Sequence, residues 1–537
     1  MTNDRDEEYS KFVPQRMSYQ VVPGAEFQCK LPLHQGRKLS TIDEQDFDKA
    51  KCWGIVRQVL ATCAVLVLST GCGMPIGYSS VLLPQLSANN TEIPIDVSVG
   101  SWIASVHSLA TPFGSLISGP LADYLGRRKT LLVSIVPLIL GWSTMAMAKS
   151  VTAIIFARFL CGFATGILGG PGQVYIAEVT EPNLRSLLIG APYVAYSSGI
   201  LLIYFLGSVF YWRNVAWYAI ALPTLAMVCI FCIPETPAWL LRNGHESRAL
   251  KALTFLRGKE ITAQKELNEM KQRLERERST SNANENIFQL CCRPEAMKPL
   301  FIAITFSLLQ MFSGTFIVIF YAADIVAEFG AINNIQQAAN WTALVRFVCC
   351  LIFCGILIFV RRRSIMIISG IGSGAFCLAL SVFMYMRVGQ PKMPYDVQVA
   401  GWCLLGYIVY NTPLMVMPGI MIGELFPARI RGRTAGGIFA SMNVALFIFA
   451  KAYPALQSWL KMRGVFMVFA VSSFLLTIFM CLFQPETKGR SLDHIEDYFK
   501  GSNWLWFRRD RGYKVSHLQP LQPLHETKPL QKHQEQA

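Results

Sequence analysis

The segments PETPAW (residues 234–239) and PETKGR (residues 485–490) each follow a long apolar run. A second pair, YIAEVTEPNLRS (175–186) and GELFPARIRGR (423–433), holds in each copy a Glu and an Arg seven residues apart with a Pro between them. A third pair is GRRK at 126 and RRRS at 361. These landmarks recur at spacings of 235 to 251 residues, which indicates two parallel repeats within one chain.

The composition places this chain in the membrane. Of its 537 residues 53% are hydrophobic and only 15% are charged, which is too little polar surface for a soluble domain of this size. The net charge of +15 does not indicate nucleic acid, because the basic residues stand at the ends of apolar runs and in one central segment. We therefore expect a lipid bilayer around the chain and no nucleic-acid partner.

The apolar runs predict the number of spans. About 20 mostly apolar residues are needed to cross the hydrocarbon layer as a helix. We predict an all-α membrane protein with twelve transmembrane helices in two six-helix parallel repeats. The predicted spans are residues 57–80, 100–122, 131–148, 151–173, 187–208, 215–233, 299–322, 338–360, 364–386, 399–422, 434–456 and 464–483.

Basic residues in the loops predict the orientation. Four short loops on one side hold ten Arg and Lys residues, whereas six loops on the other side hold six. The positive-inside rule then places both termini in the cytoplasm. No signal-peptide pattern precedes the first span, and we expect a multi-pass protein of the plasma membrane. The sequon at Asn89 falls on an outside loop and is a predicted glycosylation site.

Polar segments divide the chain. We expect a cytoplasmic tail, a six-helix half, a cytoplasmic helical linker rich in helix formers and alternating charges, a second half and a final cytoplasmic tail. The predicted boundaries are residues 1–54, 55–233, 234–298, 299–484 and 485–537.

Six ordered motifs resemble the sugar transporter branch of the major facilitator superfamily. They are GPLADYLGRRK (119–129), RFLCGF (158–163), YIAEVTEPNLRS, PETPAW, GELFPARIRGR and PETKGRSL (485–492). The resemblance covers about residues 55–500 and is greatest to animal facilitated trehalose transporters. It implies a carrier that moves a sugar by alternating access.

The repeated charged motifs are candidate gating elements. Gly126 permits a short turn that Arg127 and Arg128 anchor, and Asp123 can face a helix N-terminus of the other half. Acidic and basic residues of the two halves can pair across the cytoplasmic face when it is closed, and each exposed pair contributes only about 0.2–1 kcal/mol. The full candidate set is Asp123, Gly126, Arg127, Arg128, Glu178, Arg185, Glu235, Glu424, Arg431 and Glu486.

The second copy of the first gating motif departs from the family pattern. The resemblance leads us to expect Asp at position 359 and Gly at position 362, where the chain has Phe359 and Arg362. We therefore expect a weaker gate in the second half.

The resemblance also implies a sugar site, which this chain has altered. The family pattern QQLSGINAVIFY is matched by QMFSGTFIVIFY (310–321), so Gln310 keeps one amide while Met311 and Phe316 replace polar residues. Asn443 keeps another amide, and Gly419 takes the place of a Trp. The candidate substrate-binding residues are Gln310, Met311, Phe316, Asn443, Arg346, Tyr193 and Asn411. Two retained amides are few for a disaccharide, because a buried hydroxyl without a partner costs about 1–3 kcal/mol.

Arg346 stands where the family has Asn, in the eighth predicted span. A cation inside a span costs at least about 2.5 kcal/mol unless it is paired or faces water. Two interpretations remain open. Arg346 faces the cavity and attracts an anionic or strongly polar substrate, or it pairs with Asp324 or Glu328 or extends to the membrane surface.

The spans contain no Asp or Glu, which favours facilitated diffusion over proton coupling. His107 is the one His within a span, and we expect it to be a packing residue. We predict a uniporter for a sugar or related small polar solute. The alternatives are a carrier of a non-sugar, possibly anionic, organic solute and a transporter-like sensor without flux. We expect no enzyme activity, no cofactor and no bound metal, and the oligomeric state is not predicted.

Overall fold

The computed structural model describes residues 41–87, 92–181, 184, 188, 190–280, 294–328, 335–357, 359–390, 394–426, 431–487 and 498–499. The chain divides into two units, Met1–Lys49 and Ala50–Ala537. In the first unit the described residues are the beginning of one helix. All the other described helices lie in the second unit.

The first half of the second unit is a helical bundle. Its helices are α1 (Thr41–Leu86), α2 (Val97–Leu125), α3 (Arg127–Ala146), α4 (Val151–Val179), α6 (Ala191–Val209), α7 (Trp212–Ala219) and α8 (Ala221–Cys232). The last two follow each other at Ile220 and together form one candidate span. The bundle packs around buried aromatic side chains, including Trp142 and Tyr78, whose rings meet edge to face at 5.1 Å.

The second half repeats this arrangement. Its helices are α13 (Pro294–Phe312), α14 (Ile317–Phe320), α15 (Ala322–Glu328), α16 (Ile335–Ile356), α17 (Arg362–Met386), α18 (Pro394–Leu425) and α19 (Arg431–Phe483). Two breaks matter. The chain unwinds between α13 and α14, and α19 is two helices that meet at Lys461, where φ is 56° and ψ is 171°.

Three short helices lie between the halves in the sequence: α9 (Pro237–Arg242), α10 (Glu246–Arg257) and α11 (Glu260–Thr280). They pack on one another and on the first half. Arg57 and Gln58 of α1 donate hydrogen bonds to carbonyl groups at the end of α10, at 3.0 and 3.2 Å. We call the end of the bundle that carries these helices the linker side. The opposite end, with the turn before Val97, is the far side.

The described helices agree with the predicted spans. Ten are long and apolar enough to cross a membrane. The Ser-rich helix α2 is not among these ten, and α19 holds two spans on either side of Lys461. Each of the twelve predicted spans therefore corresponds to one helix or to two consecutive helices, and the all-α fold class is confirmed.

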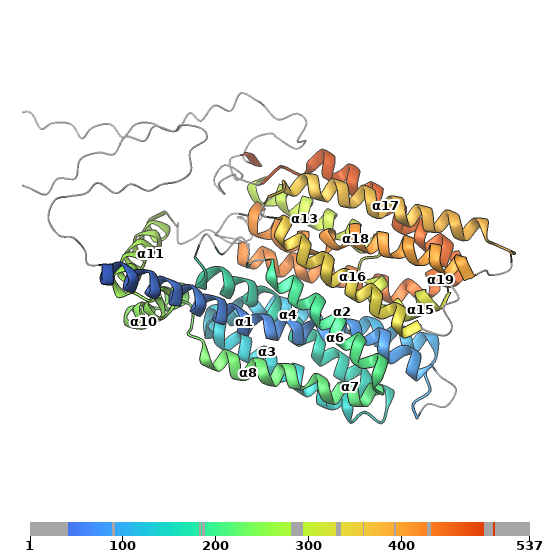
Figure 1. Ribbon diagram of the computed structural model, residues 1–537, viewed down its shortest axis with the longest axis horizontal. Coiled ribbons are helices and arrows are strands. Elements are labelled where there is room, and N and C mark those ends of the chain that lie inside the picture. The colour runs from blue at the N-terminus through green and yellow to red at the C-terminus, as the bar shows by residue number, and fades with distance from the viewer. Residues whose placement is uncertain are drawn as a thin grey trace, which may run out of the picture. The chain divides into compact units, whose positions relative to one another are not determined.

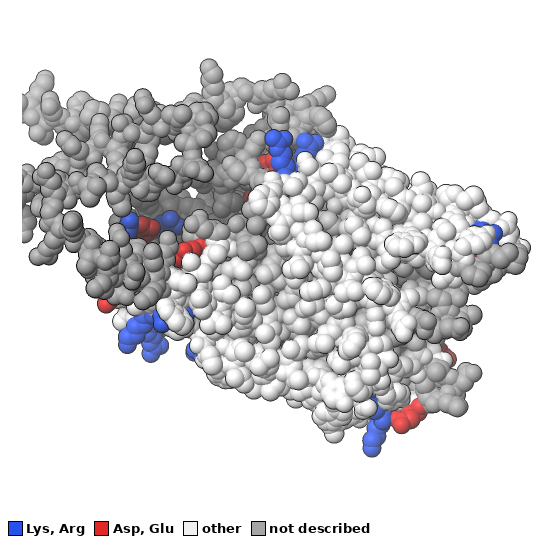
Figure 2. Space-filling model, in the orientation of Figure 1, with Lys and Arg blue, Asp and Glu red and all other residues white. Residues whose placement is uncertain are grey.

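The two halves lie side by side. In Figure 1 the blue to green helices of the first half lie next to the yellow to red helices of the second. The contacts between them are made mainly by α2 with α19 and by α6 with α16. Figure 2 shows a broad uncharged surface, with Lys, Arg, Asp and Glu confined to its ends, as a lipid-facing protein requires.

Helices α2 and α4 pack closely against each other. A Cβ atom at Gly114 or Gly166 would lie 2.2 Å from a backbone oxygen of the neighbouring helix. These two positions therefore require glycine, because any side chain would push the two helices apart.

Candidate functional site

A cavity of about 140 Å³ lies between the two halves. Helices α1, α2, α4 and α6 form one wall, and α14, α18 and α19 with the turn before α14 form the other. Sites for drug-sized ligands enclose about 300–1,000 Å³. The cavity therefore has to widen before a disaccharide can occupy it.

The first-half wall is polar. His107, Ser108, Thr111 and Ser115 lie along one face of α2 and line the cavity. The Oγ1 atom of Thr165, on α4, is 3.4 Å from Nε2 of His107. The hydroxyl of Ser108 is buried and has no hydrogen-bond partner among the described residues. This wall therefore offers hydroxyl groups and an imidazole, all able to donate or accept hydrogen bonds.

Tyr193 of α6 crosses from this wall to the second half. Its hydroxyl accepts a hydrogen bond of 3.0 Å from Nε2 of Gln173. The same hydroxyl packs on Gly419 of α18, where an added Cβ would lie only 1.6 Å from it. Tyr193 therefore occupies the space that a side chain at position 419 would need.

The second-half wall is mostly apolar. Asn443 is the amide in it, and its Nδ2 donates to the carbonyl of Phe439 at 2.8 Å within its own helix. The hydrophobic side chains of this wall come from α14, α18, α19 and the turn before α14: Phe316, Phe320, Met415, Phe439, Met442 and Leu446. One wall thus presents polar groups and the other presents apolar surface.

Three of the predicted substrate-binding residues line this cavity: Tyr193, Phe316 and Asn443. The other four, Gln310, Met311, Arg346 and Asn411, are buried outside its lining. For these four the structure corrects the expectation that they face one common central space with the others.

For Gln310 and Met311 the reason is the break in the seventh span. The helix ends at Phe312 and resumes at Ile317, with Gly314 between them at a φ of 87°. A Cβ at Gly314 would lie 2.5 Å from the ring of Phe469, so the turn is held tightly against α19. The break turns Phe316 toward the cavity and leaves Gln310 on another side. In one continuous helix the positions of Gln310 and Phe316 would be related by the helical repeat, and the break removes that relation.

The sequence interpretation missed the polar wall of the first half. His107 was expected to be a packing residue, yet it lies in the cavity wall. The available signal was the spacing of His107, Ser108, Thr111 and Ser115, which places them on one face of a helix.

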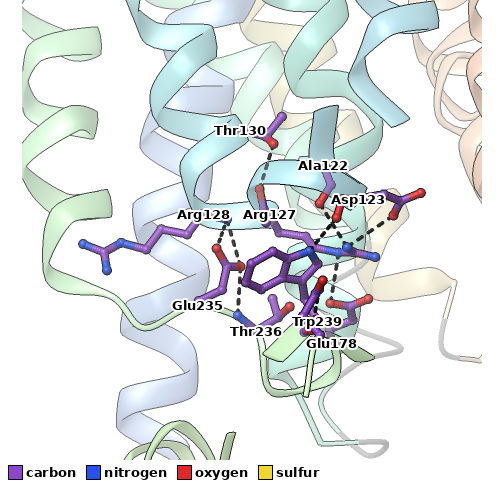
Figure 3. Close-up of polar contacts among 11 residues, drawn as sticks. Ala122, Asp123, Arg127, Arg128, Thr130, Glu178, Glu235, Thr236 and Trp239 are labelled. Atoms are coloured by element: carbon purple, nitrogen blue, oxygen red, sulfur yellow. Dashed lines mark hydrogen bonds and ion pairs between the residues drawn. The ribbon is translucent and has the colours of Figure 1, made fainter. Parts of the chain in front are cut away.

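The N-half charge cluster comprises Asp123, Arg127, Arg128, Glu178 and Glu235 and lies on the linker side (Figure 3). The carboxylate of Glu235 accepts from the backbone N–H of Arg128 at 3.1 and 3.2 Å. Arg127 pairs with Asp123 and with Glu178, each at 3.4 Å. Burial raises the pKa of Glu235 above its usual range. These contacts fix the turn between α2 and α3.

Gly126 makes that turn possible. Its φ of 97° and ψ of 161° are open to glycine, and a Cβ there would lie 2.4 Å from Oε2 of Glu235. Figure 3 shows the ring of Trp239 close to the same turn, where its Nε1 donates to the carbonyl of Asp123 at 2.9 Å.

The C-half charge cluster comprises Arg362, Arg363, Glu424 and Glu486, and its guanidinium contacts repeat those of the N-half cluster. The backbone N–H of Arg362 donates to Glu486 at 3.2 Å, and its guanidinium pairs with Glu424 at 3.3 Å. The guanidinium of Arg127 also bonds the carbonyl five residues before it, and that of Arg362 does the same at Leu357.

This pattern corrects the sequence register. Arg362 occupies the position of Arg127, and Arg361, with a φ of −70°, occupies that of Gly126. The expectation that Arg362 replaces a glycine was therefore wrong by one residue. The C-half cluster keeps its arginine and its two glutamates, but the place of the glycine is taken by Arg361, and the weaker gate of the second half stays a prediction.

Among the described residues, three acidic side chains of these clusters form ion pairs within their own halves. Glu178 pairs with Arg127 and Glu424 pairs with Arg362, each within its own half. Asp123 likewise pairs within its own half. The predicted gating residue Arg185 lies outside the described residues, and Arg431 begins α19 with its side chain outside them.

The far side is closed by bonds between the halves. The hydroxyl of Tyr204, on α6, donates to the carbonyl of Ile319 at 2.6 Å. The backbone N–H of Ala323 donates to the hydroxyl of Ser80 on α1 at 3.1 Å. Lys451 of α19 adds a third connection, because its Nζ donates to Ser101 of α2 at 2.8 Å. The central cavity is therefore separated from the far side in this conformation.

Within the described ranges no group of three or more His, Cys, Asp or Glu side chains is arranged to hold a metal ion. The polar groups of the cavity are hydroxyls, amides and one imidazole, which suit hydrogen bonding to a neutral polar solute.

The comparisons with known proteins agree with this architecture. The family model "Sugar (and other) transporter" matches residues 58–499. The facilitated trehalose transporter Tret1 of Apis mellifera ligustica is 32% identical over 455 residues, which cover 83% of this chain and 88% of that protein. Tret1 of Drosophila yakuba is also 32% identical, but the match covers 86% of this chain and 54% of that longer protein.

A solved structure shares the fold. It is that of the major facilitator superfamily proton:xylose symporter XylE bound to 6-bromo-6-deoxy-D-glucose. The TM-score is 0.67 at 19% identity, and the match covers 83% of this chain and 99% of XylE. The chain therefore has the major facilitator fold and belongs to the sugar (and other) transporter family.

Proposed function

We propose that this protein carries a sugar or a related small polar solute across the membrane by alternating access, without coupling to protons. The observation that carries the proposal is the cavity between two repeat-related halves, closed on the far side by bonds that join those halves. A carrier of this design needs such a central space and a closure that can open.

The chemistry of the cavity supports a sugar. A sugar presents hydroxyl groups and apolar ring faces, and the two walls offer hydrogen-bonding groups on one side and hydrophobic surface on the other. The names of the relatives point to trehalose, although the chain spans about half the length of the Drosophila yakuba protein. We propose His107, Thr165, Gln173 and Asn443 as the main polar contacts.

The absence of carboxylates from the cavity lining supports facilitated movement. No Asp or Glu lies among the residues that line the described cavity. Proton-coupled carriers commonly hold an ionisable group within the membrane, and His107 is the imidazole available here.

The two charge clusters support a role in the conformational cycle. Each one ties the turn between two spans to the segment after the sixth or twelfth span. We propose that each cluster keeps its half rigid while the halves move against each other. The proposed gating residues are those of the two clusters with Gly126, Arg185 and Arg431.

We further propose that the linker side faces the cytoplasm of a cell with the protein in its plasma membrane, with both termini on that side. The density of basic residues in the short loops supports this orientation. The five segments predicted from the sequence remain the proposed domain division. Asn89 lies outside the described residues, and its glycosylation remains a proposal.

Uptake by purified protein in proteoliposomes tests the function. Radiolabelled trehalose, glucose and xylose are each measured with and without a pH gradient. We expect saturable uptake that equilibrates without accumulation. Accumulation driven by the pH gradient would overturn the uniport proposal, and binding without flux would favour a sensor.

A matched pair of glycine variants tests the cavity. Gly419→Ala places a methyl group against the Tyr193 hydroxyl and is expected to reduce uptake strongly. Gly437→Ala adds the same methyl group to α19, where nothing lies within 4 Å. Equal uptake by both variants would show that substrate does not pass between Tyr193 and Gly419.

A further inference from the structure

Arg346 is a buried cation without a matching anion. It lies in α16 with 2% of its surface exposed, and its Nη1 has no hydrogen-bond partner among the described residues. The ion pairs found in the described chain do not include it, so the expected pairs with Asp324 and Glu328 are not formed. Its burial also excludes extension to the membrane surface.

The groups around Arg346 are neutral. Its electrostatic neighbours are Tyr407 of α18, Tyr204 of α6 and the thiols of Cys349 and Cys350. Both tyrosines already use their hydroxyl protons, since Tyr407 donates to the carbonyl of Ser313 at 2.8 Å and Tyr204 donates to that of Ile319. The guanidinium is thus held among groups that do not neutralise its charge.

Unpartnered amide groups lie on the other side of Tyr407. Ser313 accepts from Tyr407 through its carbonyl and from Nδ2 of Asn411 through its hydroxyl, at 3.2 Å. The Oδ1 of Asn411 and both polar atoms of the Gln310 side chain are buried and unpartnered among the described residues. Tyr407, an electrostatic neighbour of Arg346, is thus linked through Ser313 to Asn411 and to the backbone carbonyl of Gln310, and the side chains of both these residues have unused hydrogen-bonding capacity.

The first half covers this region only in the closed conformation. Tyr204 belongs to the first half, and its bond to Ile319 is one of the bonds that close the far side. When the halves separate on that side, this bond must break and Tyr204 must withdraw from Arg346. The arginine would then face the space that opens toward the far side.

We propose that Arg346, with Gln310 and Asn411, forms a site for a small organic carboxylate, such as a sugar acid, that is uncovered when the far side opens. A guanidinium binds a carboxylate through two parallel hydrogen bonds, and the amides can bind the hydroxyl groups of the same molecule. The site rests on the proposed alternating access, because it is covered in the closed conformation. It selects anionic over neutral sugars from the far side.

Calorimetric titration of the purified protein in nanodiscs tests the site. The probes are sodium D-glucuronate and D-glucose, which differ chiefly in a carboxylate, in a chloride-free buffer. We expect wild-type protein to bind glucuronate more tightly than glucose by about tenfold or more. Arg346→Gln should abolish this preference. The control Arg387→Gln removes an arginine of the same half that pairs with Asp396 at 2.6 Å, and it should keep the preference.

Equal binding of the two probes by wild-type protein would overturn the proposal, as would a preference that survives in Arg346→Gln. If that variant fails to fold, Tyr204→Phe decides. Tyr204→Phe loses the hydrogen bond to Ile319 that helps to keep the site covered. This variant should therefore bind glucuronate several-fold more tightly than wild-type protein does. An unchanged affinity would contradict a site that is covered in the closed conformation. Tight Arg346-dependent binding of chloride alone would assign the site to inorganic anions and would also overturn the carboxylate proposal.

The two proposals fail separately. Calorimetry needs no flux, so Arg346-dependent glucuronate binding without sugar uptake would retain the site and reject the carrier. Sugar uptake without such binding would retain the carrier and reject the site.

Discussion

Two arginines lie fully buried among the membrane-spanning helices, one in each half, and their surroundings differ. Arg158 of α4 is 1% exposed and Arg346 of α16 is 2% exposed. The guanidinium of Arg158 donates to carbonyl groups of Pro75, Ile103 and Ala104 and to the hydroxyl of Ser79. Among the described residues, no hydrogen bond of this kind satisfies Nη1 of Arg346.

The difference separates a structural cation from a candidate binding group. Arg158 connects α4 to α1 and α2, and its hydrogen bonds offset part of the cost of burying a charge. Arg346 bears that cost without comparable bonds in the closed conformation. We infer that an unpaired buried arginine acts in another state of the protein, the one that is open on the far side. This inference is the basis of the proposed carboxylate site.

The largest expected effect is at Arg158. Arg158→Met removes the guanidinium that joins α4 to carbonyl groups of α1 and α2 and to the Ser79 hydroxyl. Hydrogen bonds to a charged group contribute about 1.5–3 kcal/mol each, so we expect a loss of about 3 kcal/mol or more. Apparent Tm and the yield of monodisperse protein in detergent measure it. A Tm like that of wild type would show that these bonds do not hold the first half together.

Arg346 should respond in the opposite direction. Arg346→Met removes a buried charge that has no anionic partner, and we expect a gain of about 1–2 kcal/mol. The same Tm assay detects it, with Arg387→Met as the control for loss of a paired arginine. A loss of stability as large as that of Arg158→Met would mean that the Arg346 guanidinium has hydrogen-bond partners in the folded protein. The two buried arginines would then not differ.

A third cation, Lys451, joins the two halves directly. It donates to Ser98 and Ser101 of α2 and lies 4.3 Å from the centre of the Trp102 ring. Lys451→Met should favour far-side opening by about 1 kcal/mol, because a cation–π contact and charge-assisted hydrogen bonds are lost.

Pulsed electron resonance measures this opening. Spin labels are placed at the exposed far-side positions Val97 and Trp459. We expect a larger share of long distances in Lys451→Met than in wild type. Lys265→Met, in the exposed part of α11, serves as the control. Identical distance distributions would show that Lys451 does not hold the far side closed.

The smallest expected effect is at Ser79, which accepts a hydrogen bond from Arg158. Ser79→Ala removes one of the acceptors of Arg158 and should cost about 1 kcal/mol. In the Arg158→Met background the same change should cost little, because the donor is already absent. Equal costs in both backgrounds would show that the two side chains do not interact energetically.

Much of the fold was predictable from local patterns. Span length, the basic loops and the repeated PET motifs led to twelve helices in two halves, and each predicted span corresponds to one helix or to two consecutive helices. The prediction of the site was less successful. Gln310 and Phe316 stand six residues apart, but the helix breaks between them, so they face different surroundings. No local pattern in SGTF shows in which direction the chain resumes.

The register of the charge clusters illustrates the same limit. The sequence places three arginines in a row at 361–363, and the choice among them depends on which guanidinium reaches the end of the twelfth span, where Arg363 donates to the carbonyl of Cys481 as Arg128 does to that of Phe231. That contact joins residues more than a hundred positions apart. Only the packing of the helices decides it.

The sequence alone determined that this is a repeated membrane carrier, because hydrophobic length and charge placement act locally along the chain and respond to the bilayer. The tertiary structure decided which side chains share a cavity, that most of its polar groups come from the first half, and that Arg158 is satisfied while Arg346 is not. The physical reason is that hydrogen-bond satisfaction depends on distances between helices, and those distances result from the packing of the whole bundle.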